Sequence, residues 1–166
     1  MLKRIHYVEW YVGNLFQASF FYEKLLGLQQ LPALKTTAAH HTIKRNFLVS
    51  GDVRVVLSAT MSKNDELSAH ITEHGDSIKD VAFVVDELET TFEAVLKNGA
   101  KIITYPKIFS VYGSEIKLAQ ISVMDSFKHT LIEMPNPDKN IFPELFNYSS
   151  EPCFINPAAK LTMIDH

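Results

Sequence analysis

The sequence predicts an α+β protein built from two tandem units, each a strand, a helix and then three strands. A strand-like apolar run leads directly into an amphipathic helix near the N-terminus, and the same order recurs from residue 80. The starting strand returns after roughly 70 to 80 residues. A unit whose sheet has one apolar face must pair with another unit to bury that face. We therefore place the two units at about 1–60 and 78–134.

The first unit begins with "IHYVEWYV" at 5–12, which is rich in the β-branched and aromatic residues typical of strands. A helix is expected over 14–27, because Asn14 and Gln17 have capping-box spacing and Gly27 can end it. Its predicted apolar face comprises Leu15, Ala18, Tyr22, Leu25 and Leu26, with Phe20 or Phe21 also in the core. Strand-like runs follow at 28–34, 41–49 and 54–60, the last two joined by a turn at 50–52.

The second unit repeats this order, with "DVAFVV" at 80–85 as its first strand. A helix over 86–99 is predicted from the capping-box spacing of Asp86 and Glu89 and from Gly99 at its end. Its apolar face is formed by Leu88, Phe92, Val95 and Leu96. The three strands expected after it are "KIITYP" at 101–106, "IKLAQISVM" at 116–124 and "HTLIEM" at 129–134.

The last part of the chain differs from both units. Residues 135–160 hold five of the seven prolines and are predicted to form a linker. After it, "LTMIDH" at 161–166 alternates apolar and polar residues at the place where a third starting strand is due. We interpret it as the first strand of a further domain. A single added edge strand or a disordered end is the alternative.

Composition excludes several classes of function. The formal net charge is -3 and the lysines and arginines are scattered, so no basic surface for nucleic acid is expected. A lone cysteine, Cys153, has no metal-type spacing and fits a reducing compartment. The longest apolar run, "VAFVV" at 81–85, is too short to cross a bilayer, so no membrane association and a soluble cytoplasmic protein are expected.

Five strings carry a family resemblance: "VEWYVGN", "HGDSIKDVAFVVDE", "NGAKIITYP", "HTLIEM" and "LTMIDH". In this order they resemble the vicinal-oxygen-chelate superfamily, of glyoxalase and bleomycin-resistance type, and within it the 4-hydroxyphenylpyruvate dioxygenase family. Ser77 departs from the glycine that this family usually has in the turn before the second unit. The resemblance implies that 1–134 form a non-catalytic N-terminal domain, that 135–160 link it, and that 161–166 open a catalytic domain.

On that resemblance His166 matches the first iron ligand of a 2-His-1-carboxylate triad whose other members lie beyond residue 166. The family's reaction converts 4-hydroxyphenylpyruvate and O2 to homogentisate and CO2 at Fe(II), in tyrosine catabolism. The resemblance also implies a homo-oligomer, whose small-molecule partners are an aromatic 2-oxo acid and O2. Residues 1–166 alone would then be an inactive scaffold. The related 4-hydroxymandelate synthases share the substrate, so the product stays open.

Within residues 1–165 the sequence predicts no catalytic or cofactor-binding residue. Trp10 stands where the resemblance places a histidine ligand, and its indole is a donor only. Asp80 and Glu133 match two other ligand positions but would form an oxygen-only pair; salt-bridged or solvated carboxylates are the simpler interpretation. His74 is expected in a loop, pairing locally. The other histidines considered are His6, His40, His41, His70 and His129, with His40 and His41 on opposite faces of a strand.

Two further functions stay open at this point. One is a metal-free protein of the same superfamily that binds a small hydrophobic molecule in a cleft. The other is an independent metalloenzyme of glyoxalase type, which is weaker because that reaction needs ligands at four strand positions and this sequence offers at most two.

Overall fold

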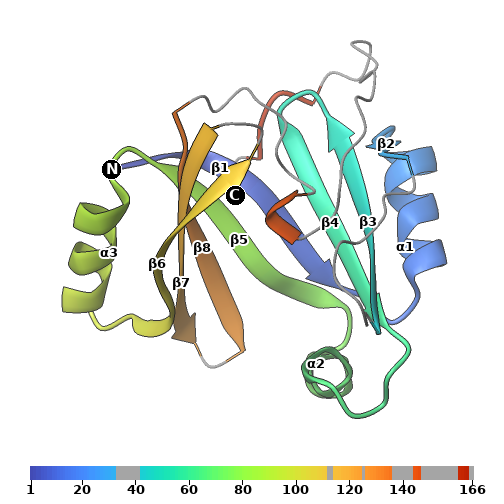
Figure 1. Cartoon of the computed structure of the whole chain (residues 1–166). Coiled ribbons are helices and arrows are strands. Elements are labelled where there is room, and N and C mark those ends of the chain that lie inside the picture. Colours follow the sequence, from blue (N-terminus) through green and yellow to red (C-terminus); the bar gives the residue numbers. More distant parts are fainter. Residues whose placement is uncertain (33–41, 112–113, 125, 136–143, 147–160, 165–166) are drawn as a thin grey trace. The chain divides into compact units, whose positions relative to one another are not determined.

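The structure is a computed structural model of the chain, and it describes residues 1–32, 42–111, 114–124, 126–135, 144–146 and 161–164. The chain divides into two compact units, which are described separately. The first unit comprises Tyr7–Ile78 and Ile141–His166, and the second comprises Met1–His6 and Lys79–Asn140. The helices, strands and their order are drawn in Figure 1.

The first unit contains a mixed sheet in the order β2-β3-β4-β1. Its strands are β1 (Leu2–Tyr11, in this unit from Tyr7), β2 (Gln29–Gln30), β3 (Ile43–Ser50) and β4 (Val53–Thr60). β1 runs parallel to β4, whereas β3 is antiparallel to both β2 and β4. The predicted strands are therefore present, although the run at 28–34 is reduced to a two-residue strand.

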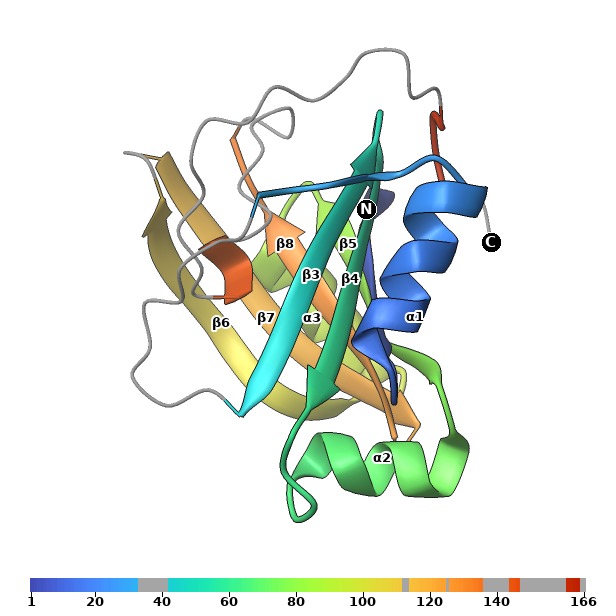
Figure 2. The same ribbon diagram turned by 90° about the vertical axis from the view of Figure 1, so that its right-hand side faces the viewer.

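Helix α1 (Leu15–Phe20) covers one face of this sheet, as Figure 2 shows. Asn14 is its N-cap as predicted, because the Asn14 Oδ1 accepts a hydrogen bond of 3.0 Å from the Gln17 backbone N–H. Leu15, Ala18 and Tyr22 pack on a core cluster from the sheet and adjoining turns. The buried members of that cluster are Val12, Leu28, Leu48, Val53, Val55 and Leu57.

The prediction that Phe20 or Phe21 is core was wrong. Their side chains are 54% and 47% exposed, and Leu25 and Leu26, assigned to the apolar face, are exposed as well. The physical reason is a π-helical turn over Phe21–Leu25, which continues directly from α1. Its wider turn rotates the following side chains away from the positions expected for 3.6 residues per turn. Gly27 ends the segment at a φ of +73°, where glycine is favoured.

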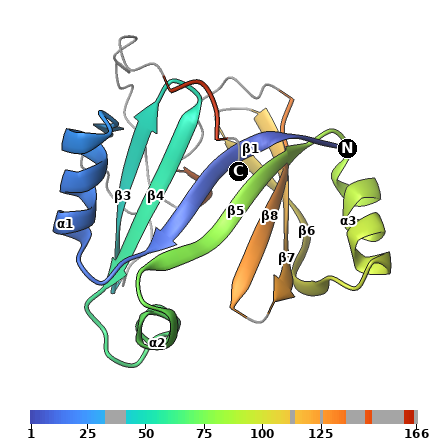
Figure 3. The same ribbon diagram turned by 180° about the vertical axis from the view of Figure 1, so that it is seen from behind.

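A second helix of this unit, α2 (Glu66–His74), follows β4 and was not predicted. Asp65 and Ser68 form a reciprocal capping box at its start, with Ser68 N donating to Asp65 Oδ1 over 2.9 Å. His74 is the last residue of α2, so its predicted place in a loop was wrong. Figure 3 shows α2 beyond the ends of β1 and β4.

The second unit holds a sheet in the order β5-β8-β7-β6. Its strands are β5 (Ser77–Val85), β6 (Lys101–Val111), β7 (Ser114–Met124) and β8 (Phe127–Glu133). β5 is parallel to β8, and the other pairs are antiparallel. Helix α3 (Leu88–Lys97) packs on one face of this sheet over a buried cluster. That cluster consists of Val85, Leu88, Phe92, Ala119, Ile121 and Leu131.

The start of α3 differs from the predicted capping box. The N-cap is Glu87, and the Leu88 backbone N–H donates instead to Glu133 Oε2 on β8, over 2.7 Å. Asp86 forms an ion pair of 2.6 Å with Lys3, and this hydrogen-bonded ammonium lowers the pKa of Asp86. A long-range contact has therefore replaced the local cap, which sequence spacing alone does not reveal.

Two short described segments come from the C-terminal part of the chain. Glu144–Phe146 form a 3-10 helix, and 161–164 have no strand assignment. The Leu161 backbone N–H approaches Ser50 Oγ at 3.4 Å, and Ile164 packs against the cluster under α1. The other residues of the predicted linker, and His166, lie outside the described residues. No helix in the described part of the chain is long and apolar enough to span a membrane.

Candidate functional site

The sheet of the first unit carries a charged cluster on the face opposite α1. Because successive strand side chains alternate between faces, Tyr7, Glu9 and Tyr11 lie together on that face of β1. Glu9 is only 1% exposed. Ser58 Oγ on β4 donates to Glu9 Oε1 over 2.7 Å, and Arg45 Nε on β3 lies 3.4 Å from the same oxygen. These partners compensate the desolvation of a buried carboxylate.

An aromatic side chain from the 3-10 helix lies over this cluster. The ring centroid of Phe146 lies 5.2 Å from that of Tyr7 and 5.6 Å from that of Phe47. The Arg45 guanidinium carbon is 5.2 Å from the Phe146 ring, a cation–π distance. Arg45 is therefore held between the Glu9 carboxylate and an aromatic face. We call Glu9, Arg45, Ser58 and Phe146 the Glu9 cluster.

The second unit has a buried carboxylate of its own, Asp80 on β5, which is fully buried. Thr130 on β8 donates to it twice, from its backbone N–H over 3.0 Å and from its hydroxyl over 2.6 Å. Lys128 Nζ lies 3.7 Å from Asp80 Oδ2. Gln120 on β7 donates to the Thr130 hydroxyl, and Thr104 on β6 donates to Gln120. This Asp80 cluster therefore runs across all four strands of its sheet.

Glu133 has a different role from Asp80. One of its oxygens accepts the Leu88 N–H at the start of α3, and the other lies 3.2 Å from Lys117 Nζ. Lys117 also reaches Glu89, and these two carboxylates raise the pKa of Lys117. Glu133 and Lys117 line a surface hollow of about 330 Å³. The Lys117 ammonium already occupies the position beside the Glu133 carboxylate, and its charge disfavours binding of a second cation there.

No three histidines of the described chain gather as metal ligands. His6 is fully buried, and His129 Nδ1 lies 3.2 Å from the Val81 carbonyl oxygen. His70 Nε2 lies 2.9 Å from Ser77 Oγ, and its ring is 4.8 Å from that of His74. Ser77, the departure noted in the sequence, therefore gives His70 a partner. His40 and His41 lie outside the described residues, so their predicted faces stay a prediction.

Comparison with known proteins shows which proteins this chain is similar to. No family model matches the chain. A curated relative, the 4-hydroxyphenylpyruvate dioxygenase of Yarrowia lipolytica, is 32% identical over 96% of this chain and 42% of its own length. The structure superposes with a TM-score of 0.72 on a triple mutant of 4-hydroxymandelate synthase from Streptomyces coelicolor, at 27% identity over 82% of this chain and 40% of that one. The chain is homologous to the N-terminal part of 4-hydroxyphenylpyruvate dioxygenases.

The fold belongs to the vicinal-oxygen-chelate superfamily, as predicted from the two repeated units. A methylmalonyl-CoA epimerase from Mycobacterium tuberculosis has the same fold, with a TM-score of 0.57 at 18% identity over 80% of this chain and 88% of that one. The chain spans about 42% of the length of the Yarrowia lipolytica dioxygenase.

The residues that resemble dioxygenase ligands do not fit a shared metal ion here. Asp80 is opposite Lys128 in the paired strands, and Glu133 lies five residues further along β8. At about 3.3 Å per residue this separates the two positions by about 16 Å, and an odd number of residues puts them on opposite sheet faces. Trp10 packs against the cluster under α1. Within the described ranges, no three histidine, cysteine, aspartate or glutamate side chains gather as metal ligands.

Asp80 was singled out from the sequence, but its partners and the members of the Glu9 cluster were not. Glu9 stands inside the apolar run "HYVEWYV", and a charge in such a strand is a signal that it needs a buried partner. Arg45, Ser58 and Thr130 carry no comparable local signal. Their roles come from cross-strand register, in which Arg45 pairs with Ser58 and Thr130 with Gln120.

Proposed function

We propose that this chain is the N-terminal, supporting part of a 4-hydroxyphenylpyruvate dioxygenase-like non-haem Fe(II) enzyme. The observation that carries the proposal is the 32% identity, which covers nearly all of this chain and less than half of the Yarrowia lipolytica dioxygenase. The whole enzyme would convert 4-hydroxyphenylpyruvate and O2 to homogentisate and CO2 in tyrosine catabolism, in the cytoplasm and as a homo-oligomer.

The contacts of the buried carboxylates among the described residues support a structural role. The two most buried carboxylates are engaged by hydroxyl, backbone and basic groups of the same unit. A carboxylate held in this way is poorly suited to bind a metal or to transfer a proton, because its lone pairs are already used. We assign residues 1–134 to the supporting domain and 135–160 to a linker.

The iron would be bound by polypeptide that begins at the end of this sequence. His166 is the proposed first ligand, in a strand starting at Leu161, and the remaining ligands would follow it. Ferrous iron held by two histidines and one carboxylate keeps open positions for a 2-oxo acid and O2. The present residues would contribute by holding this strand in place, since Ile164 already packs against the first unit.

A chimera tests this proposal. Residues 1–160 of this chain would replace the corresponding part of the Yarrowia lipolytica dioxygenase, and oxygen uptake with 4-hydroxyphenylpyruvate would be measured. We expect turnover by the chimera and none by residues 1–166 alone. In the chimera, Glu133→Gln should retain iron, whereas replacing by alanine the histidine aligned with His166 should release it. Oxygen uptake by residues 1–166 alone would refute the division of roles.

A second candidate activity is that of a 4-hydroxymandelate synthase. The superposition at a TM-score of 0.72 favours keeping it, since that protein matches this chain over 82% of its length. Product analysis of the natural full-length protein would separate the two: homogentisate supports the dioxygenase, and 4-hydroxymandelate supports the synthase.

A metal-free binding protein is the other alternative, because Trp10 occupies a ligand position. Calorimetric titration of residues 1–166 with 4-hydroxyphenylpyruvate, without metal, would favour it if one tight equivalent bound. The supporting role instead predicts no tight binding of this substrate.

A further inference from the structure

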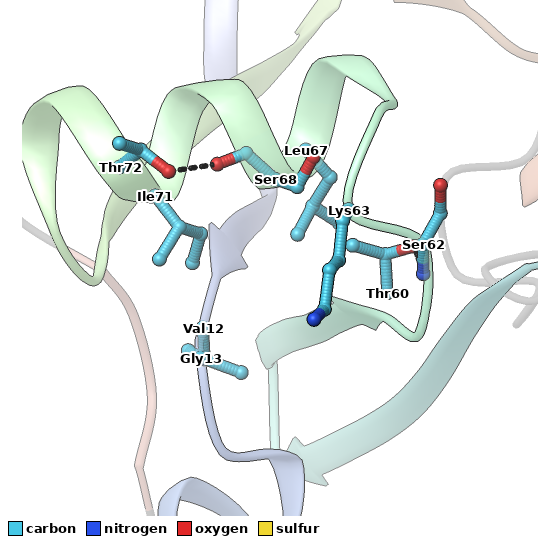
Figure 4. A pocket seen from close by; sticks show the side chains of 9 residues that line it. All are labelled: Val12, Gly13, Thr60, Ser62, Lys63, Leu67, Ser68, Ile71 and Thr72. Carbon is cyan, nitrogen blue, oxygen red and sulfur yellow. Dashed lines mark hydrogen bonds between the residues drawn. The ribbon is translucent and has the colours of Figure 1, made fainter.

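We infer that the first unit carries a binding site for a small monocarboxylate with an apolar body, in a hollow beside α2. This site goes beyond the proposed function and does not depend on it. The hollow has a volume of about 420 Å³, which lies within the range of small-molecule pockets. It is drawn in Figure 4, and it belongs entirely to the first unit.

Three segments form the walls of the hollow. Val12 and Gly13 follow β1, Ser62 and Lys63 follow β4, and one side of α2 supplies Leu67, Ser68, Ile71 and Thr72. Val12 and Leu67 are only 4% and 2% exposed, so they form an apolar floor with Ile71 beside them. An aromatic or branched aliphatic group placed there would remove apolar surface of both the ligand and the protein from contact with water.

Most polar groups at the hollow are already used by the start of α2. The Thr60 hydroxyl donates to Asp65, and the Ser68 hydroxyl donates to the Asp65 carbonyl while accepting from its N–H. The Thr72 hydroxyl donates to the Ser68 carbonyl. These bonds keep the wall rigid and leave few neutral donors for a ligand.

Lys63 is the charged side chain of the lining. Figure 4 shows it extending from the loop after β4 toward Val12 and Gly13. Among the described residues no carboxylate forms an ion pair with it. The nearby Asp65 carboxylate is bound by Thr60 and Ser68, bonds that also lower its pKa. An ammonium beside an apolar floor favours an anionic head joined to an apolar body, which is the chemistry of a monocarboxylate.

Phenylacetate is a suitable probe, and phenylacetamide is its neutral counterpart of the same shape. Both would be titrated into residues 1–166 while NMR follows the Gly13 amide and the Ile71 methyl signals. We expect phenylacetate to shift both signals with a Kd in the millimolar range, as fits so small a ligand. Phenylacetamide should bind at least about tenfold more weakly, because it lacks the charge-assisted contact.

Substitution of the lysine makes the test specific. Lys63→Met keeps the length of the side chain and removes its charge, and it should weaken phenylacetate binding by about tenfold or more. Lys63→Arg should keep binding within about threefold, because the charge is retained. Lys24→Met, at another exposed lysine of the same unit, is the matched control and should change nothing. The inference is overturned if Lys63→Met binds like the unchanged chain, or if Gly13 and Ile71 do not shift.

Discussion

Each of the two units stabilises one buried carboxylate, but with different partners. In each, a carboxylate on the first strand is buried and is held by a hydroxyl from the parallel neighbour strand, Ser58 for Glu9 and Thr130 for Asp80. A basic side chain lies close to each, Arg45 or Lys128. Asp80 also accepts a backbone N–H, whereas the Glu9 cluster is covered by Phe146. Asp80 is thus stabilised by its own sheet, and Glu9 depends partly on a segment distant in sequence.

That difference gives the two clusters different roles in the fold. Removing Asp80 would affect four strands of one sheet, because the hydrogen bonds continue through Gln120 to Thr104. Removing Glu9 would affect Arg45 and with it the position of the 3-10 helix at Glu144–Phe146. The comparison therefore predicts that the Asp80 cluster governs stability and that the Glu9 cluster also anchors the C-terminal part of the chain.

The largest effect is expected at Asp80. Asp80→Ala leaves the buried Thr130 N–H and hydroxyl without their acceptor, and should lower the free energy of unfolding by about 3–4 kcal/mol. Asp80→Asn keeps one acceptor oxygen and should lose less. Urea denaturation followed by circular dichroism measures both. A loss below that of Glu9→Ala would break the ranking of the two clusters.

Glu9 should come next. Glu9→Ala is expected to reduce the free energy of unfolding by about 2–3 kcal/mol, less than Asp80→Ala, because Ser58 donates to Glu9 through its hydroxyl alone, whereas Thr130 donates to Asp80 through both its hydroxyl and its backbone N–H. Glu9→Gln retains the hydrogen bond from Ser58 and should be milder. The same urea series provides the measurement, and equal losses for glutamine and alanine would show that the Ser58 bond contributes nothing.

Phe146 tests whether the Glu9 cluster anchors the 3-10 helix. Phe146→Ala should destabilise by about 1–2 kcal/mol through loss of the ring contacts with Tyr7, Phe47 and Arg45. Combined with Glu9→Ala it should be less than additive, since both changes release Arg45. Phe16→Ala is the matched control, because Phe16 is 82% exposed and should change stability by less than about 0.5 kcal/mol. Strictly additive losses in the double mutant would show that Glu9 and Phe146 stabilise the protein independently and not through a shared Arg45.

A smaller effect is expected at the far end of the Asp80 cluster. Thr104 lies on the edge strand β6. Thr104→Val removes its 3.3 Å hydrogen bond to Gln120 on β7 and should reduce stability by about 0.5–1 kcal/mol. Thr90→Val, which removes an exposed hydroxyl bond to Glu87 at α3, is its control and should have a smaller effect. If Thr104→Val is silent in the urea series, the cluster ends at Gln120.

The weakest effect is expected at Asp65, whose half-buried carboxylate should make stability depend on pH in the acid range. Its bond from Thr60 is the main cause that lowers its pKa below the ordinary value, with the Ser68 bonds adding to it. A lowered native pKa means that stabilisation is fully present above about pH 4 and is lost as pH falls through the native pKa. Comparing the unfolding midpoints of the unchanged chain and Asp65→Asn from pH 7 to pH 2 should show their difference shrinking only in the acid range.

The parts of the fold that follow local patterns were predicted from the sequence. Alternating and β-branched runs gave the strands, and Asn14 and Gly27 marked the ends of the first helical segment because their cap and turn chemistry is local. Helix α2 was missed although Asp65 and Ser68 carry the cap that starts it. The π-helical turn was missed because it breaks the 3.6-residue period on which the core assignment of Phe20 and Phe21 relied.

The partners of the buried carboxylates could not be predicted from the sequence, because they depend on strand register and tertiary packing. The resemblance paired Asp80 with Glu133 as matches to ligand positions, but strand register puts them on opposite faces of one sheet. Asp86 was expected to cap the start of α3. Instead Glu133 accepts the hydrogen bond from the Leu88 N–H, which lies 45 residues before it in the sequence. The approach of Phe146 to Arg45 likewise depends on tertiary packing and leaves no local pattern.

Iron stoichiometry decides whether residues 1–166 form a metal-free supporting part. Purified residues 1–166 would be loaded with Fe(II) under anaerobic conditions, desalted and analysed for metal, next to the full-length Yarrowia lipolytica dioxygenase as a positive control. We expect no stoichiometric iron on residues 1–166, because Asp80 stabilises the sheet of the second unit, Glu133 accepts the N–H at the start of α3, and the two do not form one site. One retained equivalent that Asp80→Asn or Glu133→Gln abolishes would contradict it.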